Sequence, residues 1–313
     1  MNKRLVLIIG VLLFTLSGKA QVYNYADGEG PTPPDSVKGF YIGGTIGAYF
    51  ANKNTAQIYG GYGYQRDGFL NNFENSWLNF AINGPPIQNK QRTNDAMNAA
   101  DGEWSFTESD MPGIMRYRPS FLFNVHFRYM LNSDFGFFME MGGTFPVTVG
   151  EFTITRTNNT GIQNDILETF AIRGEEQRLI INIGMHKVLG REAAERKGKN
   201  PSILPYIDLG GTLTFTKYEA NFINLDLGTN NVEFFNPIVD LSIQRNVDGS
   251  VYNQANVLTG VGLGGFGSVG LQLTLGRKFT IDFGYVANLQ QINLGEVSEI
   301  GLQHQFVLRA IYM

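Results

Sequence analysis

Hydrophobic and polar residues alternate along several stretches of the chain. In residues 121–131, one face carries Phe121, Phe123, Val125, Phe127, Tyr129 and Leu131, and the other carries Leu122, Asn124, His126 and Arg128. This period of two residues is that of a β-strand. Similar alternation is found at 40–50, 120–131, 135–149, 178–189, 204–216, 261–275, 279–290 and 302–312. These segments are near the length of about 10 residues that crosses a bilayer as a strand.

The links between these segments alternate in length. Long links are expected at 51–116, 150–176 and 217–256, with a shorter one at 291–298, whereas short links fall near 132–134, 190–202 and 276–278. Short turns at one end and long loops at the other are typical of outer-membrane barrels. The pattern therefore predicts an antiparallel, up-and-down, transmembrane β-barrel of eight strands, with ten as the alternative. An even strand number places both termini on the periplasmic side.

A soluble β-sandwich would also show alternation. Its polar face would meet water and carry many Lys and Glu side chains. Here one face is aromatic and aliphatic, and the other is rich in Thr, Gly and Asn with few charges. This contrast favours a lipid-facing exterior around a polar lumen, and it predicts an integral outer-membrane protein.

The N-terminus predicts export from the cytoplasm. Lys3 and Arg4 precede an apolar run at 5–16, and Gly18 and Ala20 are small residues suited to cleavage before Gln21. This order is typical of a secretory signal peptide. We therefore expect a signal peptide at 1–20, a flexible periplasmic segment at 21–37 and a barrel at 38–313. In the segment before the barrel, Ser36 stands within a short "DSV" sequence that resembles a bacterial O-glycosylation motif.

Charge and composition narrow the functional classes. The formal net charge of −4 makes nucleic acid a poor candidate partner. The chain contains no cysteine, which excludes a disulfide framework. Its three histidines, His126, His186 and His304, show no metal-ligand spacing, so we expect neither a metal nor a cofactor.

A glycine-rich stretch, "GVGLGGFG" at 260–267, matches the G-x-G-x-x-G spacing of dinucleotide-binding loops. That motif requires a helix after the glycines. Here strict alternation continues through Val269, Leu271, Leu273 and Leu275. The stretch is therefore interpreted as part of a glycine-rich strand.

Three features resemble the outer-membrane β-barrel proteins of the Bacteroidota. They are the signal that ends in "GKAQ", the opening strand "GFYIGGTIGAYF" and the terminal strand "HQFVLRAIYM". The resemblance implies insertion by the outer-membrane assembly machinery. It covers the strands and names no activity.

Six ionisable residues are expected to point into the lumen near its periplasmic end: Arg128, Glu140, His186, Asp208, Asp282 and Arg309. An eight-stranded barrel has an interior that side chains just fill. Buried charges need partners. We therefore predict a closed polar core, with Arg128 near Glu140 and Arg309 near Asp282; an ion path or a catalytic role is the alternative.

The first long loop concentrates aromatic residues. A candidate partner-binding surface comprises Tyr59, Tyr62, Tyr64, Phe69, Phe73 and Trp77. The alternative is a loop that packs on itself and caps the barrel. The sequence thus favours a non-enzymatic barrel whose outer loops bind a protein partner, as an accessory subunit of a larger complex. A narrow solute channel is the second hypothesis, and a barrel hydrolase or acyltransferase is the third.

Overall fold

The computed structural model describes residues 38–62, 73–83, 87–157, 165–191, 194, 202–225, 232–234, 244–245, 251–252, 259–275, 279–294 and 297–312. All of them belong to one compact unit, residues 35–313. The signal peptide and periplasmic segment expected at 1–37 lie outside the described residues.

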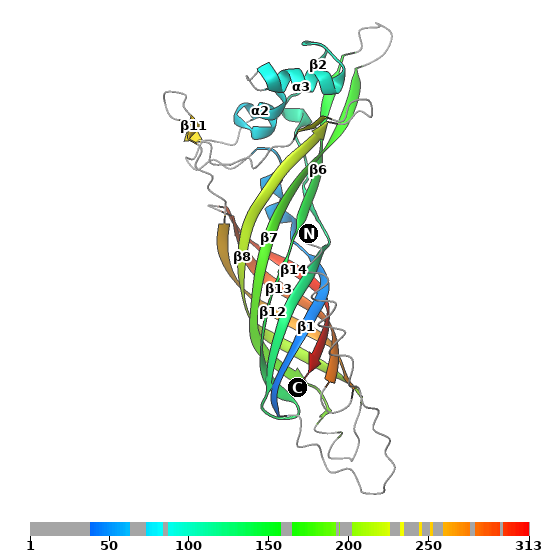
Figure 1. Cartoon of the computed structure of the whole chain (residues 1–313), viewed down its shortest axis with the longest axis vertical. Coiled ribbons are helices and arrows are strands. Elements are labelled where there is room, and N and C mark those ends of the chain that lie inside the picture. Colours follow the sequence, from blue (N-terminus) through cyan, green and yellow to red (C-terminus); the bar gives the residue numbers. More distant parts are fainter. Residues whose placement is uncertain are drawn as a thin grey trace, which may run out of the picture. The chain divides into compact units, whose positions relative to one another are not determined.

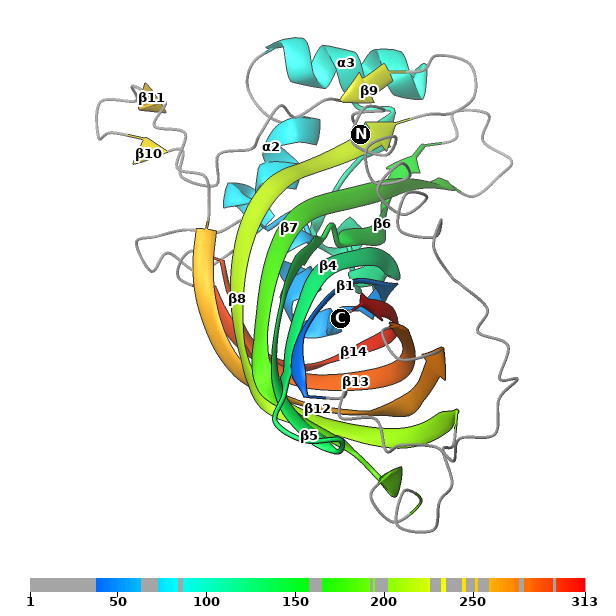
Figure 2. The same ribbon diagram turned by 60° about the horizontal axis from the view of Figure 1, so that its bottom comes forward.

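Eight antiparallel strands close into a ring, which confirms the predicted fold class (Figures 1 and 2). The strands are β1 (Gly39–Phe50), β4 (Ser120–Met130), β5 (Phe135–Thr144), β7 (Ile166–Val188), β8 (Ile203–Leu225), β12 (Thr259–Leu275), β13 (Phe279–Leu294) and β14 (Val297–Tyr312). Their pairings follow the order β1–β4–β5–β7–β8–β12–β13–β14 and return from β14 to β1. The glycine-rich stretch lies inside β12, as its alternation predicted.

Side chains alternate between the lumen and the outside of the ring. On β4, Phe121 is 65% exposed, whereas Asn124, His126 and Arg128 are buried. Because paired residues of neighbouring strands share a face, the same alternation continues around the barrel.

Strands β6 (Val147–Arg156), β7 and β8 continue beyond the ring (Figure 1). The lower half of β7 pairs with β5, and its upper half pairs with β6. Pro146 separates β5 from β6, since it has no N–H for a strand ladder. The loops expected at 150–176 and 217–256 are shorter than predicted. Strands β6 and β7 occupy most of the first range, and β8 extends into the start of the second.

The link from β1 to β4 folds into short elements above the ring. They are η3 (Lys53–Tyr59), η4 (Phe73–Asn75), α2 (Trp77–Asn83), α3 (Ile87–Met97), β2 (Trp104–Ser105), η5 (Glu108–Asp110) and β3 (Arg116–Arg118). Strands β2 and β3 both pair with β6. We call these elements, together with β6 and the upper ends of β7 and β8, the head. Three further short strands are β9 (Val232–Phe234), which pairs with β8, and β10 (Gln244–Arg245), which pairs with β11 (Val251–Tyr252).

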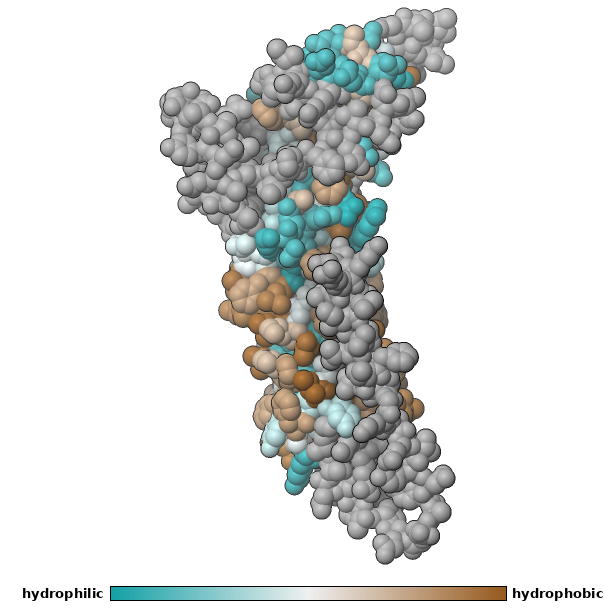
Figure 3. Space-filling model, viewed as in Figure 1, coloured by the Kyte–Doolittle hydropathy of each residue, from teal (hydrophilic) through white to brown (hydrophobic). Residues whose placement is uncertain are grey.

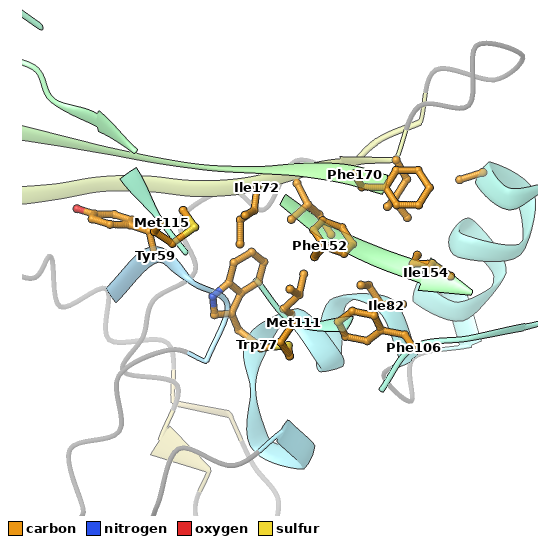
Figure 4. Packing of buried hydrophobic residues seen from close by; sticks show 14 of the residues in the cluster. Tyr59, Trp77, Ile82, Phe106, Met111, Met115, Phe152, Ile154, Phe170 and Ile172 are labelled. Carbon is orange, nitrogen blue, oxygen red and sulfur yellow. The ribbon is translucent and has the colours of Figure 1, made fainter. Parts of the chain in front are cut away.

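The head has its own hydrophobic core. Figure 4 shows side chains of the helical segment facing those of the extended strands. Trp77, Ile82 and Phe106 come from the link, and Phe152 and Ile172 come from β6 and β7. Burying such a side chain stabilises a fold by about 1.5–3 kcal/mol. The head is therefore a packed structure that the extended strands support.

The outer surface of the ring is a band of exposed apolar side chains. Its most exposed members include Leu263 at 68%. Figure 3 shows these residues in brown below a hydrophilic region in teal. We call this band the apolar belt; its members include Ile42, Ile46, Phe121, Phe137, Met139, Met141, Phe145, Leu179, Ile183, Met185, Ile207, Leu209, Phe215, Val261, Leu263, Val269, Leu271, Phe283, Leu289, Ile300, Leu302, Phe306 and Tyr312. Among the described residues, no helix is long and apolar enough to cross a membrane.

Candidate functional site

The six ionisable residues expected in the lumen are all buried there. Arg128, His186, Asp208 and Asp282 are buried with Glu140 and Arg309, near the end of the ring that carries the short links. We call this group the lumen cluster. It combines two guanidinium groups with three carboxylates, so each charge has an opposite charge within reach.

Of the predicted neighbours, Arg309 lies directly opposite Asp282 in the register of β13 and β14, but the ion pairs join other partners. Arg128 bonds to Asp282 at 2.6 Å, and Arg309 bonds to Glu140 at 3.2 Å and to Asp208 at 3.0 Å. His186 Nδ1 lies 2.6 Å from the Oδ1 atom of Asp208. The predicted partners followed nearness in sequence and across one strand pair. In the closed ring, long side chains reach across the lumen instead.

Further side chains extend this network, among them Asn124, which donates to Glu140. Ser268 donates to Asp208 at 2.7 Å, Gln272 donates to Asp282 at 3.1 Å, and His126 Nδ1 lies 3.3 Å from Glu140. The sequence analysis did not count His126, Ser268 or Gln272 among the residues of the expected lumen site. The alternation of β12 carries the missing signal, because Ser268 and Gln272 both lie on its inward face.

The order of groups around Asp208 differs from that of a catalytic triad. In a triad, the imidazole lies between the nucleophilic hydroxyl and the carboxylate. Here the Asp208 carboxylate lies between Ser268 and His186 and accepts from Ser268. His186 is therefore not placed to take the proton of Ser268, and the contacts are those of a structural network.

The middle of the lumen holds apolar and neutral polar side chains together. Thr212 is buried there and hydrogen-bonds to Asn182 and Asn288. The apolar cluster beside them comprises Tyr49, Leu122, Phe138, Ile180, Phe266, Val286 and Val307. Glycines make room for its largest rings. A Cβ atom at Gly184 or Gly210 would lie within 3.0 Å of the Phe266 ring.

A second polar group fills the lumen at the end nearest the head. Arg178 is fully buried and bonds to Glu176, and it donates to the Tyr49 hydroxyl at 2.8 Å. Tyr59 and Tyr117 donate to Glu176 Oε2 at 2.9 and 3.1 Å. We call these five residues, with Thr55, the mouth cluster. Because η3 and β3 supply Tyr59, Thr55 and Tyr117, this cluster ties the head to the ring.

The tyrosines of the mouth cluster stay protonated at neutral pH. Burial raises the pKa of Tyr59 and Tyr117, and the negative charge of Glu176 raises both further. A protonated hydroxyl can donate to the carboxylate, whereas a phenolate would repel it. The lumen of the described ring is thus filled at three levels, by the lumen cluster, the apolar cluster and the mouth cluster.

The aromatic residues expected to bind a partner differ in how deeply they are buried. Tyr59 and Trp77 are buried in the head core, and Tyr62 and Phe73 pack against it. Tyr64 and Phe69 lie outside the described residues. The buried pair stabilises the head and is not presented to a partner. This arrangement agrees with the alternative of a loop that packs on itself.

One polar pair lies within the apolar belt. Tyr285 Oη and His304 Nδ1 are 2.6 Å apart, with stacked rings, on the outer faces of β13 and β14. A groove of about 580 Å³ begins beside them and is lined by Tyr285, Phe283, Phe306 and neighbouring belt residues. His304 faces outward, as its position in the alternation of β14 indicated. In the part of the chain that the structure describes, no group of three or more His, Asp and Glu side chains could hold a metal ion.

Comparisons with known proteins found distant structural matches. No family model and no curated protein matches the chain. Similar solved structures include Ail of Yersinia pestis, the Neisserial surface protein NspA and OprG of Pseudomonas aeruginosa, which are small outer-membrane β-barrel proteins. Ail has 13% identity and a TM-score of 0.31, with coverage of 88% of this chain and 98% of that one.

The values for the other two structures are alike. NspA has 10% identity and a TM-score of 0.37, with coverage of 88% and 97% of the two chains. OprG has 10% identity and a TM-score of 0.33, with coverage of 88% and 93%. The Bacteroidota resemblance stays a prediction, and the barrel is established by the strand pairings of this chain itself.

Proposed function

We propose that this chain is a non-enzymatic, integral outer-membrane barrel that presents its head outside the cell as an interaction module. The observation that carries the proposal is the apolar belt around a ring whose lumen is filled with polar side chains. In water, an exposed apolar surface that surrounds a protein would drive aggregation. In a bilayer, the same surface is satisfied by lipid.

The orientation follows from the positions of the ends and the links. The start of β1, the end of β14 and the short links at 131–134 and 276–278 belong to the same end of the ring. In outer-membrane barrels the short turns face the periplasm. We therefore place both termini in the periplasm, where the assembly machinery engages the terminal strand, and the head outside the cell.

The filled lumen supports an interaction role over a channel role. Ion-paired side chains occupy both ends of the lumen, and bulky side chains such as Phe138 and Phe266 lie between them. A conducting pore would need an open water path past these side chains. Steady conductance of the purified protein in a planar bilayer would contradict this account.

The head supplies the surface for a protein partner, such as a larger outer-membrane complex that this chain joins as an accessory subunit. Its helix α3 is rich in Asn, Gln and charged residues, and Gln91 and Asp95 are exposed. The rim of a protein interface is polar and accessible to water, and α3 matches that composition.

A mild-detergent pull-down from native outer membranes, read by mass spectrometry, tests this role. Deleting residues 55–110 would also remove Tyr59 and Trp77 from their cores, so surface variants are preferable. We expect a stoichiometric partner with the wild type, lost in Gln91→Arg/Asp95→Arg and kept in Ser202→Arg at the opposite end. Recovery of the barrel alone would contradict the interaction role.

A further inference from the structure

Two arginines stand on the outer face of the head immediately above the apolar belt. They are Arg116 and Arg118 of β3, on either side of Tyr117, whose hydroxyl points inward to Glu176. Since alternate residues of a strand point to opposite faces, both arginines point outward. They are exposed.

Their guanidinium groups have no polar partner in the part of the chain that the structure describes. Among the described residues, neither Arg116 nor Arg118 has an ion pair or a side-chain hydrogen bond. The other exposed cations on this side differ, because Arg173 bonds to Glu175 and Lys217 bonds to Glu219.

The strand register places these charged side chains near one another. Arg116 pairs with Val149, which pairs with Arg173 on its other side. Arg118 pairs with Val147, which pairs with Glu175. Strands lie about 4.8 Å apart, so Arg116 and Arg173 are roughly 10 Å from each other along one row. The unpaired Arg116 and Arg118 thus share one face with the Arg173–Glu175 pair and with the exposed Glu151 of β6.

The belt begins directly below this face. Phe145 is 63% exposed and lies two residues before Val147, roughly 7 Å along the chain. Phe121 is equally exposed and follows Arg118 by three residues. On the described strands β12, β13 and β14, no Lys or Arg stands above the belt. Elsewhere on the described rim, the exposed cations are Lys53 and Lys217, and Lys217 is paired with Glu219.

We propose that Arg116 and Arg118, assisted by Arg173, bind the phosphate of a lipid headgroup whose acyl chains lie over Phe121 and Phe145. Arginine matches phosphate through parallel N–H donors. An amphiphile satisfies both halves of the site, because its phosphate sits at the level of the arginines and its chains at the level of the belt. The site rests on the membrane placement proposed above and adds a specific lipid to it.

The test measures lipid binding to the full chain by native mass spectrometry. The detergent-solubilised protein receives equal amounts of phosphatidic acid and phosphatidylcholine with the same acyl chains. We expect the wild type to prefer phosphatidic acid, and Arg116→Gln/Arg118→Gln to lose that preference by at least about tenfold, since each surface cation contributes to anionic lipid binding.

Two controls separate the lipid site from general effects. Arg156→Gln removes an arginine of β6 that is paired with Glu168, seven residues beyond Val149, and should keep the preference. Glycerol phosphate, which has the phosphate without acyl chains, should not displace the bound lipid at millimolar concentration.

Several outcomes would overturn the site. An unchanged preference in the double variant, an equal loss in Arg156→Gln, or displacement by glycerol phosphate would each do so. Insertion of the wild type into lipid nanodiscs is measured in parallel. Insertion without lipid preference refutes this site alone, whereas failure to insert refutes the membrane placement and the site with it.

Discussion

At the scale of single residues, the lumen shows how charges are kept inside a barrel. Arg128 and Asp282 are both buried and bond to each other, and Gln272 supplies a further donor to Asp282. Removing two charges from water costs free energy, and good ion-pair geometry with additional hydrogen bonds offsets this cost. The sequence identified the members of the lumen cluster but not their partners. Partner choice depends on distances across the closed ring, which no single strand contains.

Breaking the Arg128–Asp282 pair should destabilise the barrel strongly. Arg128→Met leaves the Asp282 carboxylate buried without its cation, and we expect a loss of roughly 3–5 kcal/mol in the free energy of unfolding. Urea unfolding in lipid vesicles, followed by circular dichroism, measures this change.

The matched control is the exposed pair of Lys217 and Glu219. Lys217→Gln should change the free energy of unfolding by less than about 1 kcal/mol. The double variant Arg128→Met/Asp282→Leu should recover part of the lost stability. Equal effects of the buried and the exposed substitution would contradict the description of the lumen cluster.

The tyrosines of the mouth cluster predict a stability change at alkaline pH. Burial and Glu176 raise the pKa of Tyr59 and Tyr117 in the folded state above the unfolded value of about 10. The folded state thus favours the protonated form. Stability is complete below about pH 10 and is lost as the pH rises through the folded pKa, because the unfolded chain releases protons first.

This change can be measured through the urea midpoint at pH 8, 9.5 and 11, followed by tryptophan fluorescence. Both tryptophans of the chain, Trp77 and Trp104, lie in the head core. The double variant Tyr59→Phe/Tyr117→Phe should have a lower midpoint at pH 8 and a shallower decline toward pH 11. An identical decline in the variant and the wild type would argue against the role of these two groups.

At the scale of elements, alternation predicted the strands of the ring well and their extensions poorly. The pattern is clear where one face meets lipid and the other meets the lumen, as in β4. Above the belt, the two faces of a strand no longer meet lipid and lumen. There β6, β7 and β8 have the head core on one face and exposed polar side chains on the other, and this contrast was interpreted as loop sequence. The head core itself unites residues from 56 to 294, so no local pattern could show it.

The head core predicts a large effect of Phe152, which is almost fully buried on β6. Phe152→Ala should lower the free energy of unfolding of the head by roughly 3–5 kcal/mol, because it leaves a cavity. Tryptophan fluorescence during urea unfolding measures this value.

Leu167, near the start of β7, offers a matched control because it is 62% exposed. Leu167→Ala should change the stability by less than about 0.5 kcal/mol. A small effect at Phe152 would mean that the head core does not support the fold.

Close packing inside the ring makes a second prediction at the level of paired strands. A Cβ atom at Gly284 of β13 would collide with the hydroxyl of Tyr206 on β8, whereas one at Gly44 of β1 would meet no atom within 4 Å. Gly284→Ala should therefore destabilise the barrel by roughly 1–3 kcal/mol, as overpacking does, and Gly44→Ala should not.

Removing the colliding atom provides the critical comparison. In a Tyr206→Phe background, most of the effect of Gly284→Ala should vanish, which a double-mutant cycle of unfolding free energies would reveal. Additive effects of the two substitutions would contradict the contact between Tyr206 and Gly284.

At the scale of the whole molecule, the belt, the lumen and the head have different surroundings. In the proposed placement, the apolar belt meets lipid, side chains occupy the lumen, and the head meets the aqueous phase outside the cell. The ring holds the strands on which the head is built, so the head folds without a disulfide in a chain of 313 residues that has no cysteine. This division into layers allows one experiment to address the whole arrangement.

The most direct test of this arrangement is cysteine labelling in cells with a membrane-impermeant maleimide, since the chain has no native cysteine. Three single variants sample the layers: Asp95→Cys on α3, Leu263→Cys in the belt and Ser202→Cys beside the short link before β8. We predict that Asp95→Cys is labelled on intact cells, that Ser202→Cys is labelled only after the outer membrane is permeabilised, and that Leu263→Cys resists labelling in both states. Labelling of Leu263→Cys as rapidly as Asp95→Cys, or labelling of Ser202→Cys on intact cells, would contradict the account.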